Sequence, residues 1–287
     1  FRRIAAGMLL GFREGASNRI VDIAECPVAR PEIVALLPAL RAFLASHAAA
    51  GEVAVTVTDT GIDLAVYTDN EIGLDLRMDA PAFCEANGVA RLSWGAPGEP
   101  TELLIALMPV RVRFGGVSAE PPPEAFLQPT SEGEAVLREF VLRAVGDADR
   151  IVDLYAGCGA FALSLSAAGK TVHAVEGLEA QTGAITRADP NISVETRDLA
   201  RQPLRAEELS RFDAVVLDPP RAGAAEQAAQ IAESGVPVVV YVSCNPGTFA
   251  RDARTLAAAG YVLETVLPVD QFLWSPHVEL ASAFRRG

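Results

Sequence analysis

The sequence places one thiol and three carboxylates at points where short apolar segments end. Cys244, Asp218, Glu176 and Asp198 each follow a run rich in Val, Ile, Leu or Ala in the second half of the 287-residue chain. Such runs are typical of strands buried in a parallel sheet, and open α/β sheets bind ligands beyond the carboxyl ends of their strands. We therefore expect these four side chains to meet at one edge of a sheet and to form a single site.

A pair of glycines predicts a cofactor loop at the same edge. Gly157 and Gly159 lie between a predicted strand and a predicted helix, where glycine lets the backbone approach a ligand at the helix N-terminus. Ala162 replaces the last glycine of the dinucleotide pattern G-x-G-x-x-G. Glu176 follows at about 20 residues, the spacing at which a carboxylate reaches ribose hydroxyls. Loop and acid together favour a nucleoside cofactor over a simple turn.

The turn after the fourth predicted strand is stiff. It reads Asp218-Pro219-Pro220-Arg221, and the two prolines prevent a helix or a strand from continuing. A rigid turn of this kind can hold a carboxylate toward a flat polar ring. Enzymes that methylate amino groups of adenine or cytosine carry a similar turn with an aromatic residue after the prolines. Arg221 stands there instead, which argues against amino methylation.

Cys244 is placed for nucleophilic chemistry on a pyrimidine. It precedes a predicted helix, whose N-terminus favours the thiolate. A thiolate that adds to carbon 6 of uracil makes carbon 5 enolate-like and able to accept a methyl group, after which a base must remove the carbon-5 proton. Alternation predicts that His277 and Glu279 share one face of a strand and that one of them is this base. For His277 a structural hydrogen bond is the stronger interpretation.

The pattern after residue 123 predicts the fold class, α/β with a doubly wound, mostly parallel seven-stranded sheet. Short apolar strands alternate with helices, which places helices on both faces of the sheet. Strands are expected at 150–155, 171–175, 192–196, 212–217, 236–242, 261–269 and 278–284, with helices at 161–168 and 248–259.

The first part of the chain predicts a smaller α+β domain. A helix pattern covers 30–50, and two alternating segments, 53–57 and 62–67, flank a hairpin turn at Asp59-Thr60-Gly61; further strands are expected at 103–108 and 110–114. Glu120 and three prolines form an extended linker. We place the domain boundary there, with a smaller α+β domain at 1–123 and the α/β domain at 124–287.

Composition sets limits on the partners. Half of the residues, 50%, are hydrophobic, which is enough for a sizeable core, and no apolar run is long enough to span a membrane. The net charge of −13 weighs against nucleic acid, although nearly all the basic residues are arginines, which suit bidentate phosphate contacts. The chain starts at Phe1 without a signal-peptide pattern. We expect a cytoplasmic, monomeric protein from which an N-terminal piece is missing.

These features resemble the RNA (uracil-5-)-methyltransferase family, whose members are class I S-adenosylmethionine-dependent enzymes that form 5-methyluridine. The resemblance covers essentially the whole chain and is densest after residue 126. It is carried by the segments Phe126-Leu127-Gln128, Asp153–Gly159, Asp218–Gly223, Tyr241–Pro246, Asp270-Gln271-Phe272 and His277-Val278-Glu279. The last four segments in this order are highly specific.

The resemblance implies a role for each matching residue. Cys244 would be the nucleophile and Glu279 the base. The cofactor would be held by Gln128, Tyr155, Gly157, Gly159, Ala160, Glu176, Asp198 and Asp218. The flipped uridine would contact Phe126, Asp218, Arg221 and His277. The sequence departs from the family at Ala156, Ala160, Thr130 and Leu273-Trp274. None of these departures removes a reacting group, although alanine at 160 puts a side-chain contact to the cofactor in doubt. The resemblance also implies that 1–123 is a central RNA-binding domain and that 124–287 is the methyltransferase domain.

The four cysteines, Cys26, Cys84, Cys158 and Cys244, contain no CxxC pair, which argues against a disulfide framework or a self-contained zinc site. Family members that act on ribosomal RNA often carry an iron–sulfur cluster whose fourth cysteine lies in a context like that of Cys26-Pro27. A 4Fe–4S cluster would need three further cysteines upstream of Phe1. If Cys26 is such a ligand, 23S ribosomal RNA is favoured over tRNA as the substrate; a buried structural cysteine is the equal alternative.

Other functions stay open at this point. A cytosine-5 RNA methyltransferase has the same chemistry, but its members usually carry a second cysteine beside the proline turn, and this turn has none. A non-catalytic RNA-binding module on a methyltransferase fold would not need both Cys244 and Glu279. A nicotinamide-dependent oxidoreductase fits the sheet and Glu176 but leaves Cys244 and the proline turn unexplained.

Overall fold

The structure is a computed structural model that describes residues 1–15 and 17–287. The chain divides into two compact units, Phe1–Val112 and Arg113–Gly287. Each is described by itself below. None of the helices in the described residues is both long and apolar enough to cross a membrane.

The first unit is built around a four-stranded sheet in the order β5-β6-β7-β8. Its elements are β1 (Arg2–Ile4), β2 (Gly7–Leu9), β3 (Gly11–Arg13), β4 (Ile20–Asp22), α1 (Pro31–His47), β5 (Glu52–Thr58), β6 (Gly61–Tyr67), α2 (Leu74–Asn87), β7 (Val89–Gly95) and β8 (Glu102–Ala106). The predicted hairpin is confirmed, because Thr58 and Gly61 pair across the turn between β5 and β6. Both helices and the sheet share one core that includes Leu44, Leu64 and Trp94.

The first unit also contains elements that the sequence pattern did not reveal. Helix α2 carries Pro81 in its interior and leads into β7, which pairs in parallel with β6. A buried ion pair joins those two strands: Arg91 Nε lies 2.8 Å from Asp63 Oδ1, and Arg91 Nη2 lies 2.6 Å from Asp63 Oδ2. This bidentate geometry fixes the register between β6 and β7.

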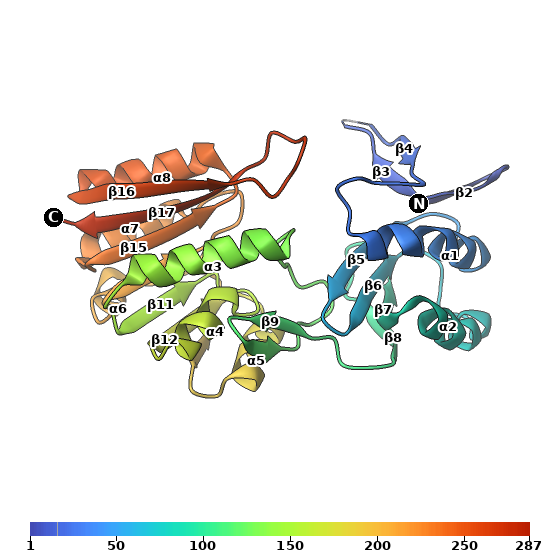
Figure 1. Ribbon diagram of the computed structural model, residues 1–287, viewed down its shortest axis with the longest axis horizontal. Coiled ribbons are helices and arrows are strands. Elements are labelled where there is room, and N and C mark those ends of the chain that lie inside the picture. The colour runs from blue at the N-terminus through green and yellow to red at the C-terminus, as the bar shows by residue number, and fades with distance from the viewer. Residues whose placement is uncertain (16) are drawn as a thin grey trace. The chain divides into compact units, whose positions relative to one another are not determined.

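The second unit contains the predicted sheet, whose seven strands run in the order β13-β12-β11-β14-β15-β17-β16 (Figure 1). Its strands are β11 (Arg150–Leu154), β12 (Thr171–Glu176), β13 (Ser193–Thr196), β14 (Ala214–Leu217), β15 (Val238–Ser243), β16 (Tyr261–Val269) and β17 (Glu279–Arg286). The first five run parallel, while β17 is antiparallel to both β15 and β16. The expectation of a doubly wound, mostly parallel sheet is confirmed.

Helices cover both faces of this sheet. They are α3 (Ser131–Val145), α4 (Ala160–Ala167), α5 (Glu179–Ala188), α6 (Ala206–Leu209), α7 (Ala225–Ser234) and α8 (Pro246–Ala258). α4 packs against α3 and α5, and α7 packs against α6 and α8 (Figure 1). The core between sheet and helices contains Leu154, Leu217, Val239 and Tyr241.

The second unit begins before the predicted boundary at residue 123. A small hairpin of β9 (Val112–Phe114) and β10 (Val117–Ala119) packs on α4 and α5. At the hairpin turn Gly115 has φ +57°, and a Cβ there would lie 2.6 Å from Ser164 Oγ of α4. This close approach attaches the hairpin to the sheet unit, so the chain divides after Val112 and the proline-rich linker lies inside the second unit.

The antiparallel insertion of β17 explains the position of Glu279. Glu279 is the first residue of β17, and Leu280 pairs with Ser243, the last residue of β15. The start of an antiparallel strand lies at the same sheet edge as the ends of its parallel neighbours. Glu279 therefore reaches the edge where β11, β12, β14 and β15 end.

Candidate active site

A cavity of about 560 Å³ lies at this edge of the sheet, entirely within the second unit. Its lining includes eleven residues that the sequence singled out: Phe126, Gln128, Tyr155, Gly157, Ala160, Glu176, Asp198, Asp218, Arg221, Cys244 and Glu279. The volume lies within the range of small-molecule sites. Gly159, His277 and Cys26 are not part of the lining. The expectation that residues at the strand ends form one site is thus met by their geometry.

The two glycines of the first loop play different parts. Gly157 has φ +56° and lines the cavity, and a Cβ added there would have no atom within 4 Å. Gly159 has φ +91°, and a Cβ there would lie 3.0 Å from Ile185 and from Leu163. Gly157 thus leaves room for a ligand, while Gly159 lets the N-terminus of α4 pack against its neighbours.

Glu176 closes the glycine loop from the neighbouring strand. Its Oε2 accepts a hydrogen bond from the backbone N–H of Gly157 at 3.0 Å, and its Oε1 accepts one from Leu178 at 3.0 Å. The carboxylate is thereby fixed at the end of β12, and each of its oxygens keeps a lone pair for a ligand hydroxyl. Leu178 also lines the cavity. It was not singled out from the sequence, where a leucine in a loop gives no distinct signal.

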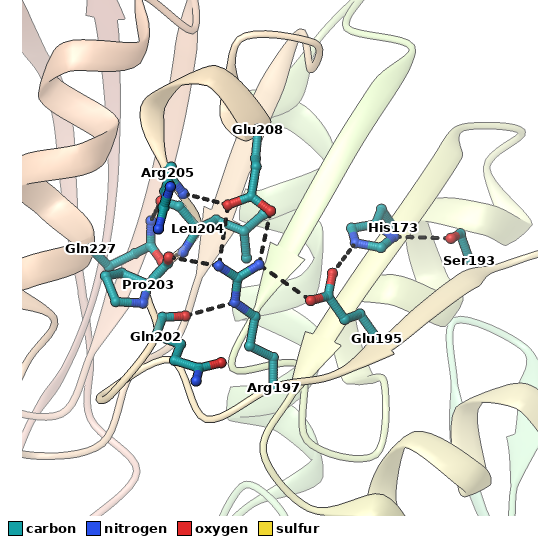
Figure 2. A network of polar contacts seen from close by, with 10 residues as sticks. All are labelled: His173, Ser193, Glu195, Arg197, Gln202, Pro203, Leu204, Arg205, Glu208 and Gln227. Carbon is teal, nitrogen blue, oxygen red and sulfur yellow. Dashed lines mark hydrogen bonds and ion pairs between the residues drawn. The ribbon is translucent and has the colours of Figure 1, made fainter.

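Asp198 is held by the segment that follows β13. Its Oδ1 accepts hydrogen bonds from Ala200 N at 3.0 Å and Arg201 N at 3.3 Å. The preceding Arg197 anchors this segment through Glu208, whose two carboxylate oxygens it contacts at 2.9 and 3.2 Å, and through two backbone carbonyls (Figure 2). The Arg197 guanidinium lowers the pKa of Glu208 to about 2. Arg197 is a support that sequence reasoning did not identify.

Asp218 is held by a chain of hydrogen bonds that starts at the N-cap of α3. Thr130 Oγ1 accepts from Gly133 N at 3.0 Å, so its hydroxyl proton is available for Gln271 Oε1 at 3.3 Å. Gln271 Nε2 donates to Gln128 Oε1 at 2.9 Å, and Gln128 Nε2 donates to Asp218 Oδ2 at 3.3 Å. Each donor points toward Asp218, so this carboxyl receives a hydrogen bond from protein.

Gly133 makes this chain of hydrogen bonds possible. It is buried in the first turn of α3, and a Cβ there would collide with the Gln271 side chain. Only glycine lets the amide of Gln271 pass the helix and reach Gln128. Neither Gly133 nor Gln271 was predicted to have a role at the site.

Asp252 of helix α8 fixes the proline turn through its contacts with the backbone that follows the turn. Asp252 is fully buried; its Oδ2 accepts from Ala224 N at 2.8 Å and from Tyr241 Oη at 2.8 Å. Gly223 has φ +77°, and a Cβ there would lie 2.8 Å from Asp252 Oδ2. These contacts fix the backbone after Arg221, and they thereby fix the position of Asp218 at the other end of the turn.

The loop of Cys244 is tied to the same turn. Asn245 caps α8, since its Oδ1 accepts from Gly247 N at 3.0 Å, and its Nδ2 donates to the carbonyl oxygen of Arg221 at 2.9 Å. Thr248 Oγ1 donates to the same carbonyl at 3.3 Å. Cys244 and Arg221 thus line the cavity from two loops that are joined by hydrogen bonds.

The electrostatics at Cys244 differ from the sequence-based prediction. The helix N-terminus led us to expect a favoured thiolate, but burial and the nearby carboxylates of Glu279 and Asp218 raise the pKa of Cys244, against a smaller lowering by Arg221. Burial also raises the pKa of Glu279, and burial together with Glu279 raises the pKa of Asp218 to about 7. Burial, together with two neighbouring carboxyl groups, outweighs the partial charge of a helix end.

Glu279 is a buried carboxyl group with one oxygen that accepts no hydrogen bond within the described residues. Its side chain is 2% exposed, and its Oε2 has no hydrogen-bond partner within the described residues. A buried carboxylate oxygen without a partner is costly, and such groups are frequent at sites that handle protons.

The prediction that His277 and Glu279 share a strand face is wrong, because β17 begins at Glu279 and His277 is exposed. Pro276 cannot donate to a strand ladder, which delays the start of β17.

His277 reaches the site through Arg221. Its Nδ1 lies 3.5 Å from Nη2 of Arg221, which lines the cavity. The predicted substrate-binding residues Arg221 and His277 are therefore neighbours at the rim. Phe126, predicted to support the target base, also lines the cavity and is largely exposed.

Cys26 lies in the first unit and is half-buried. Residues 1–15 and 17–287 hold no group of three or more His, Cys, Asp or Glu side chains that could bind a metal ion. The residues present do not fit a complete iron–sulfur cluster, since Cys26 has no co-ligands among them.

Comparison with known proteins gives consistent results. The family model for tRNA (uracil-5-)-methyltransferases matches residues 197–286. An uncharacterized RNA methyltransferase of Mesorhizobium japonicum is 46% identical over 287 residues, which cover 97% of this chain and 68% of the relative. A 23S rRNA (uracil(1939)-C(5))-methyltransferase of Alteromonas naphthalenivorans is 30% identical over 96% of this chain and 61% of the relative.

A solved structure resembles both units. The tRNA (uracil-54, C5)-methyltransferase of Pyrococcus abyssi, in complex with S-adenosyl-L-homocysteine, matches with a TM-score of 0.78 and 25% sequence identity. The match covers 98% of this chain and 72% of that chain.

Proposed function

This chain belongs to the RNA (uracil-5-)-methyltransferase family, and we propose that it methylates carbon 5 of a uridine in RNA through a covalent bond between Cys244 and carbon 6. The observation that carries the proposal is that Cys244, directly after β15, and Glu279, the first residue of the adjacent strand β17, line one cavity. A nucleophile and a base are the two groups that this chemistry requires of the protein.

The cavity suits S-adenosylmethionine on the side of β11 to β13. When bound, this cofactor supplies an electrophilic methyl group. Glu176 offers carboxylate lone pairs to the ribose, and the open space at Gly157 admits the ligand to the N-terminus of α4. Asp198 and Tyr155 line the same side. Support also comes from the Pyrococcus abyssi relative, which was solved with S-adenosyl-L-homocysteine.

The uracil ring would lie between Cys244 and the proline turn. The sulfur of Cys244, as thiolate, forms a bond to carbon 6, and the electron pair of the 5,6 double bond moves toward carbon 5 and oxygen 4. Carbon 5 would then take the methyl group that S-adenosylmethionine supplies, and S-adenosyl-L-homocysteine would be the leaving group. Glu279 removes the proton from carbon 5, the double bond forms again and the sulfur leaves as thiolate. The sulfur is thus a thiolate again at the end of the step, and the carbon-5 proton is on Glu279, which releases it before the next turnover.

The raised pKa of Cys244 has a consequence for the order of events. Because burial and carboxylates disfavour the thiolate, the free protein holds a thiol that is less reactive than an ordinary cysteine. Its proton must leave before attack. The acceptor must be a carboxylate other than Glu279, because Glu279 has to be ionised when it takes the carbon-5 proton. Asp218, which lies near this thiol and whose pKa is raised to about 7, fits that role.

Asp218 and Gln128 would read the edge of the base. Gln128 donates to Asp218 Oδ2 at 3.3 Å, so the other carboxylate oxygen can accept from a ring N–H of uracil. Cytosine has no N–H at that ring position, which favours uridine over cytidine as the target. Phe126, Arg221 and His277 would support the nucleotide at the rim.

We propose 23S ribosomal RNA ahead of tRNA as the substrate. The Alteromonas naphthalenivorans relative, named for a 23S rRNA uracil, is 30% identical, while the Pyrococcus abyssi tRNA enzyme is 25% identical. The iron–sulfur role of Cys26 stays a prediction that depends on further thiolates, and no step of the reaction above uses it.

The test is methyl transfer from labelled S-adenosylmethionine to unmodified ribosomal RNA and unmodified tRNA, offered separately, followed by digestion to nucleosides. Label in 5-methyluridine from the ribosomal pool is the expected result. Label in 5-methylcytidine would mean that the base assignment is wrong. Cofactor binding without label in either pool would mean that the chain is a binding module on a methyltransferase fold.

A further inference from the structure

The connection between β16 and β17, residues 270–278, carries an exposed tryptophan. Trp274 is 82% exposed and its neighbour Leu273 is 58% exposed. Large apolar side chains that lie side by side expose apolar surface to water at a cost in free energy. Tryptophan is enriched at interfaces, where a partner covers such surface. The roles assigned above do not involve either residue.

The backbone holds Trp274 in this position. Ser275 N donates to the carbonyl of Phe272 at 3.0 Å, and His277 N donates to Ser275 Oγ at 3.1 Å. The rings of Phe272 and His277 meet edge to face at 5.9 Å. Within this turn Trp274 has φ +62°, a left-handed conformation that costs energy for a residue other than glycine. The turn thus presents the indole outward at the expense of local strain.

The loop lies at the rim of the cavity. It ends at Glu279, which lines the cavity, and His277 contacts Arg221, which also lines it. At its other end Gln271 is buried against α3 and joins the hydrogen bonds that reach Asp218. Figure 1 shows the connection at the end of the sheet where β17 begins. Trp274 is thus an exposed ring on a loop that is anchored at both ends to residues of the cavity or its supports.

The chemistry of the loop favours a nucleobase over a phosphate. The segment Asp270–Val278 contains no lysine or arginine, so it lacks the cations that bind a phosphate backbone. An indole stacks on any nucleobase, since every base has a π face. A uridine that enters the cavity leaves its neighbours in the RNA without a stacking partner on one side. The exposed indole can supply the stacking partner that such a neighbouring base has lost.

We propose that Trp274 stacks on a nucleobase that flanks the target uridine, and so takes the place that the uridine vacates when it leaves the RNA stack; this rests on the proposed function. Stacking on an aromatic residue depends little on the charge of the protein. It therefore lets a chain with a net charge of −13 bind RNA with few phosphate contacts at this rim.

The two tryptophans of the chain allow a direct test. Trp94 is 1% exposed and Trp274 is 82% exposed, so quenching by acrylamide reports on Trp274. We expect an RNA that contains the target uridine to quench the accessible emission and to protect it from acrylamide. An RNA with an abasic site beside the target, scanned on the 5′ and the 3′ side, should lose this protection on one side only. Emission that stays open to acrylamide in the RNA complex would overturn the proposal.

Kinetics supply a second readout. Trp274→Ala should raise KM for RNA about tenfold, within the range for loss of one base–aromatic stack, with little change in affinity for S-adenosylmethionine. Trp274→Phe should recover most of the loss because it keeps a π face, and Leu273→Ala in the same turn is the matched control with unchanged KM. Equal KM for Trp274→Ala and the unaltered protein would contradict the proposal.

Failure of this inference is distinguishable from failure of the proposed function. If the unaltered protein forms no 5-methyluridine, the reaction is wrong, yet the fluorescence still reports whether Trp274 meets a base. If 5-methyluridine forms and neither fluorescence nor KM responds to the abasic sites and the variants, the reaction stands and Trp274 has no part in binding RNA. Protection by a protein partner but not by RNA would likewise overturn the proposal.

Discussion

Gln271 donates a hydrogen bond from its Nε2 to Oε1 of Gln128 at 2.9 Å, across 143 positions of sequence. This contact sets which end of the Gln128 amide faces Asp218. With its oxygen occupied by Gln271, Gln128 turns its Nε2 toward Asp218 Oδ2. A donor that faces a carboxyl favours the ionised form, whereas burial and Glu279 raise the pKa of Asp218 to about 7. Gln271 therefore acts against the raised pKa of a residue that it does not touch.

Gln271→Met tests this arrangement. The amide of Gln128 loses its orientation, so the ionised form of Asp218 loses a donor and its pKa rises. We expect the acid limb of the rate–pH profile to move to higher pH and kcat/KM at pH 7 to fall several-fold, as for loss of a hydrogen bond worth about 1 kcal/mol. The measurement is kcat/KM from pH 6 to pH 9.

Thr130 offers a matched pair of controls for that experiment. Thr130→Ser keeps the hydroxyl that donates to Gln271 and caps α3, whereas Thr130→Val removes both. Only the valine variant should shift the acid limb in the direction of Gln271→Met. An unshifted limb in Gln271→Met, with reduced rate at all pH values, would mean that Gln271 serves packing alone.

Glu279→Gln separates formation of the covalent adduct from its release. Glutamine keeps the shape of the side chain but cannot take the carbon-5 proton, so the methylated adduct should accumulate instead of resolving. We expect turnover to fall at least a hundredfold, consistent with loss of a general base. A protein–RNA band that survives denaturing gel electrophoresis measures the adduct.

Cys244→Ala is the counterpart of that variant. Without sulfur neither the adduct nor 5-methyluridine should form, while binding of S-adenosylmethionine should stay intact. A covalent band in the alanine variant would exclude Cys244 as the nucleophile, and rapid release in Glu279→Gln would assign the base to another residue.

The charge of Glu279 should also be visible in the reactivity of the free thiol. Glu279 raises the pKa of Cys244, so Glu279→Gln should lower it and increase the thiolate fraction near pH 8. We expect alkylation of Cys244 by iodoacetamide to become several-fold faster. Mass spectrometry of the Cys244 peptide gives the rate, with Cys26 of the other unit as reference in the same sample. Slower alkylation in the variant would mean that the carboxylate activates the thiol.

Much of the sheet could be predicted from the sequence because its central strands, such as β14 and β15, are buried on both faces. Continuous apolar runs such as Val238–Ser243, ended by Pro or Gly, indicate a parallel strand without help from tertiary contacts. The prolines that follow Asp218 and Asn245 indicate where these strands end, so the positions of Asp218 and Cys244 at one edge were predictable. Helix α2 was not, since Pro81 interrupts it and its polar and apolar residues give no clear period.

What the sequence could not reveal depends on contacts between distant residues. The pairing of Gln271 with Gln128 requires the loop before β17 to fold back on α3, and no local pattern predicts which amide meets which. The pKa of Cys244 depends on burial and on the charges of Glu279, Asp218 and Arg221, which lie elsewhere in the sequence. The local pattern indicated only the helix N-terminus. His277 was placed on a strand because alternation outweighed the effect of Pro276.

The anchoring of the segment after Asp198 leads to a prediction about stability and pH. Glu208 pairs with Arg197, which lowers the pKa of Glu208 to about 2 from an ordinary value of 4.5. A carboxyl group whose pKa is lower in the folded than in the unfolded state stabilises the folded state at pH values above its unfolded pKa. This stabilisation is lost as the pH falls through the folded pKa. The pair is partly exposed, so Glu208→Gln should cost this segment about 1 kcal/mol at pH 7.

Amide hydrogen exchange in residues 197–209 measures that cost. The difference between Glu208→Gln and the unaltered protein should be constant from pH 7 to about 5 and shrink below about 4.5, as the glutamate of the unfolded state takes up its proton. Glu207→Gln, one residue earlier and exposed, is the matched control and should leave exchange unchanged. A difference that stays constant down to pH 3 would mean that Glu208 acts through its shape and neutral hydrogen bonds, and that its charge does not hold Arg197 in place beside Asp198.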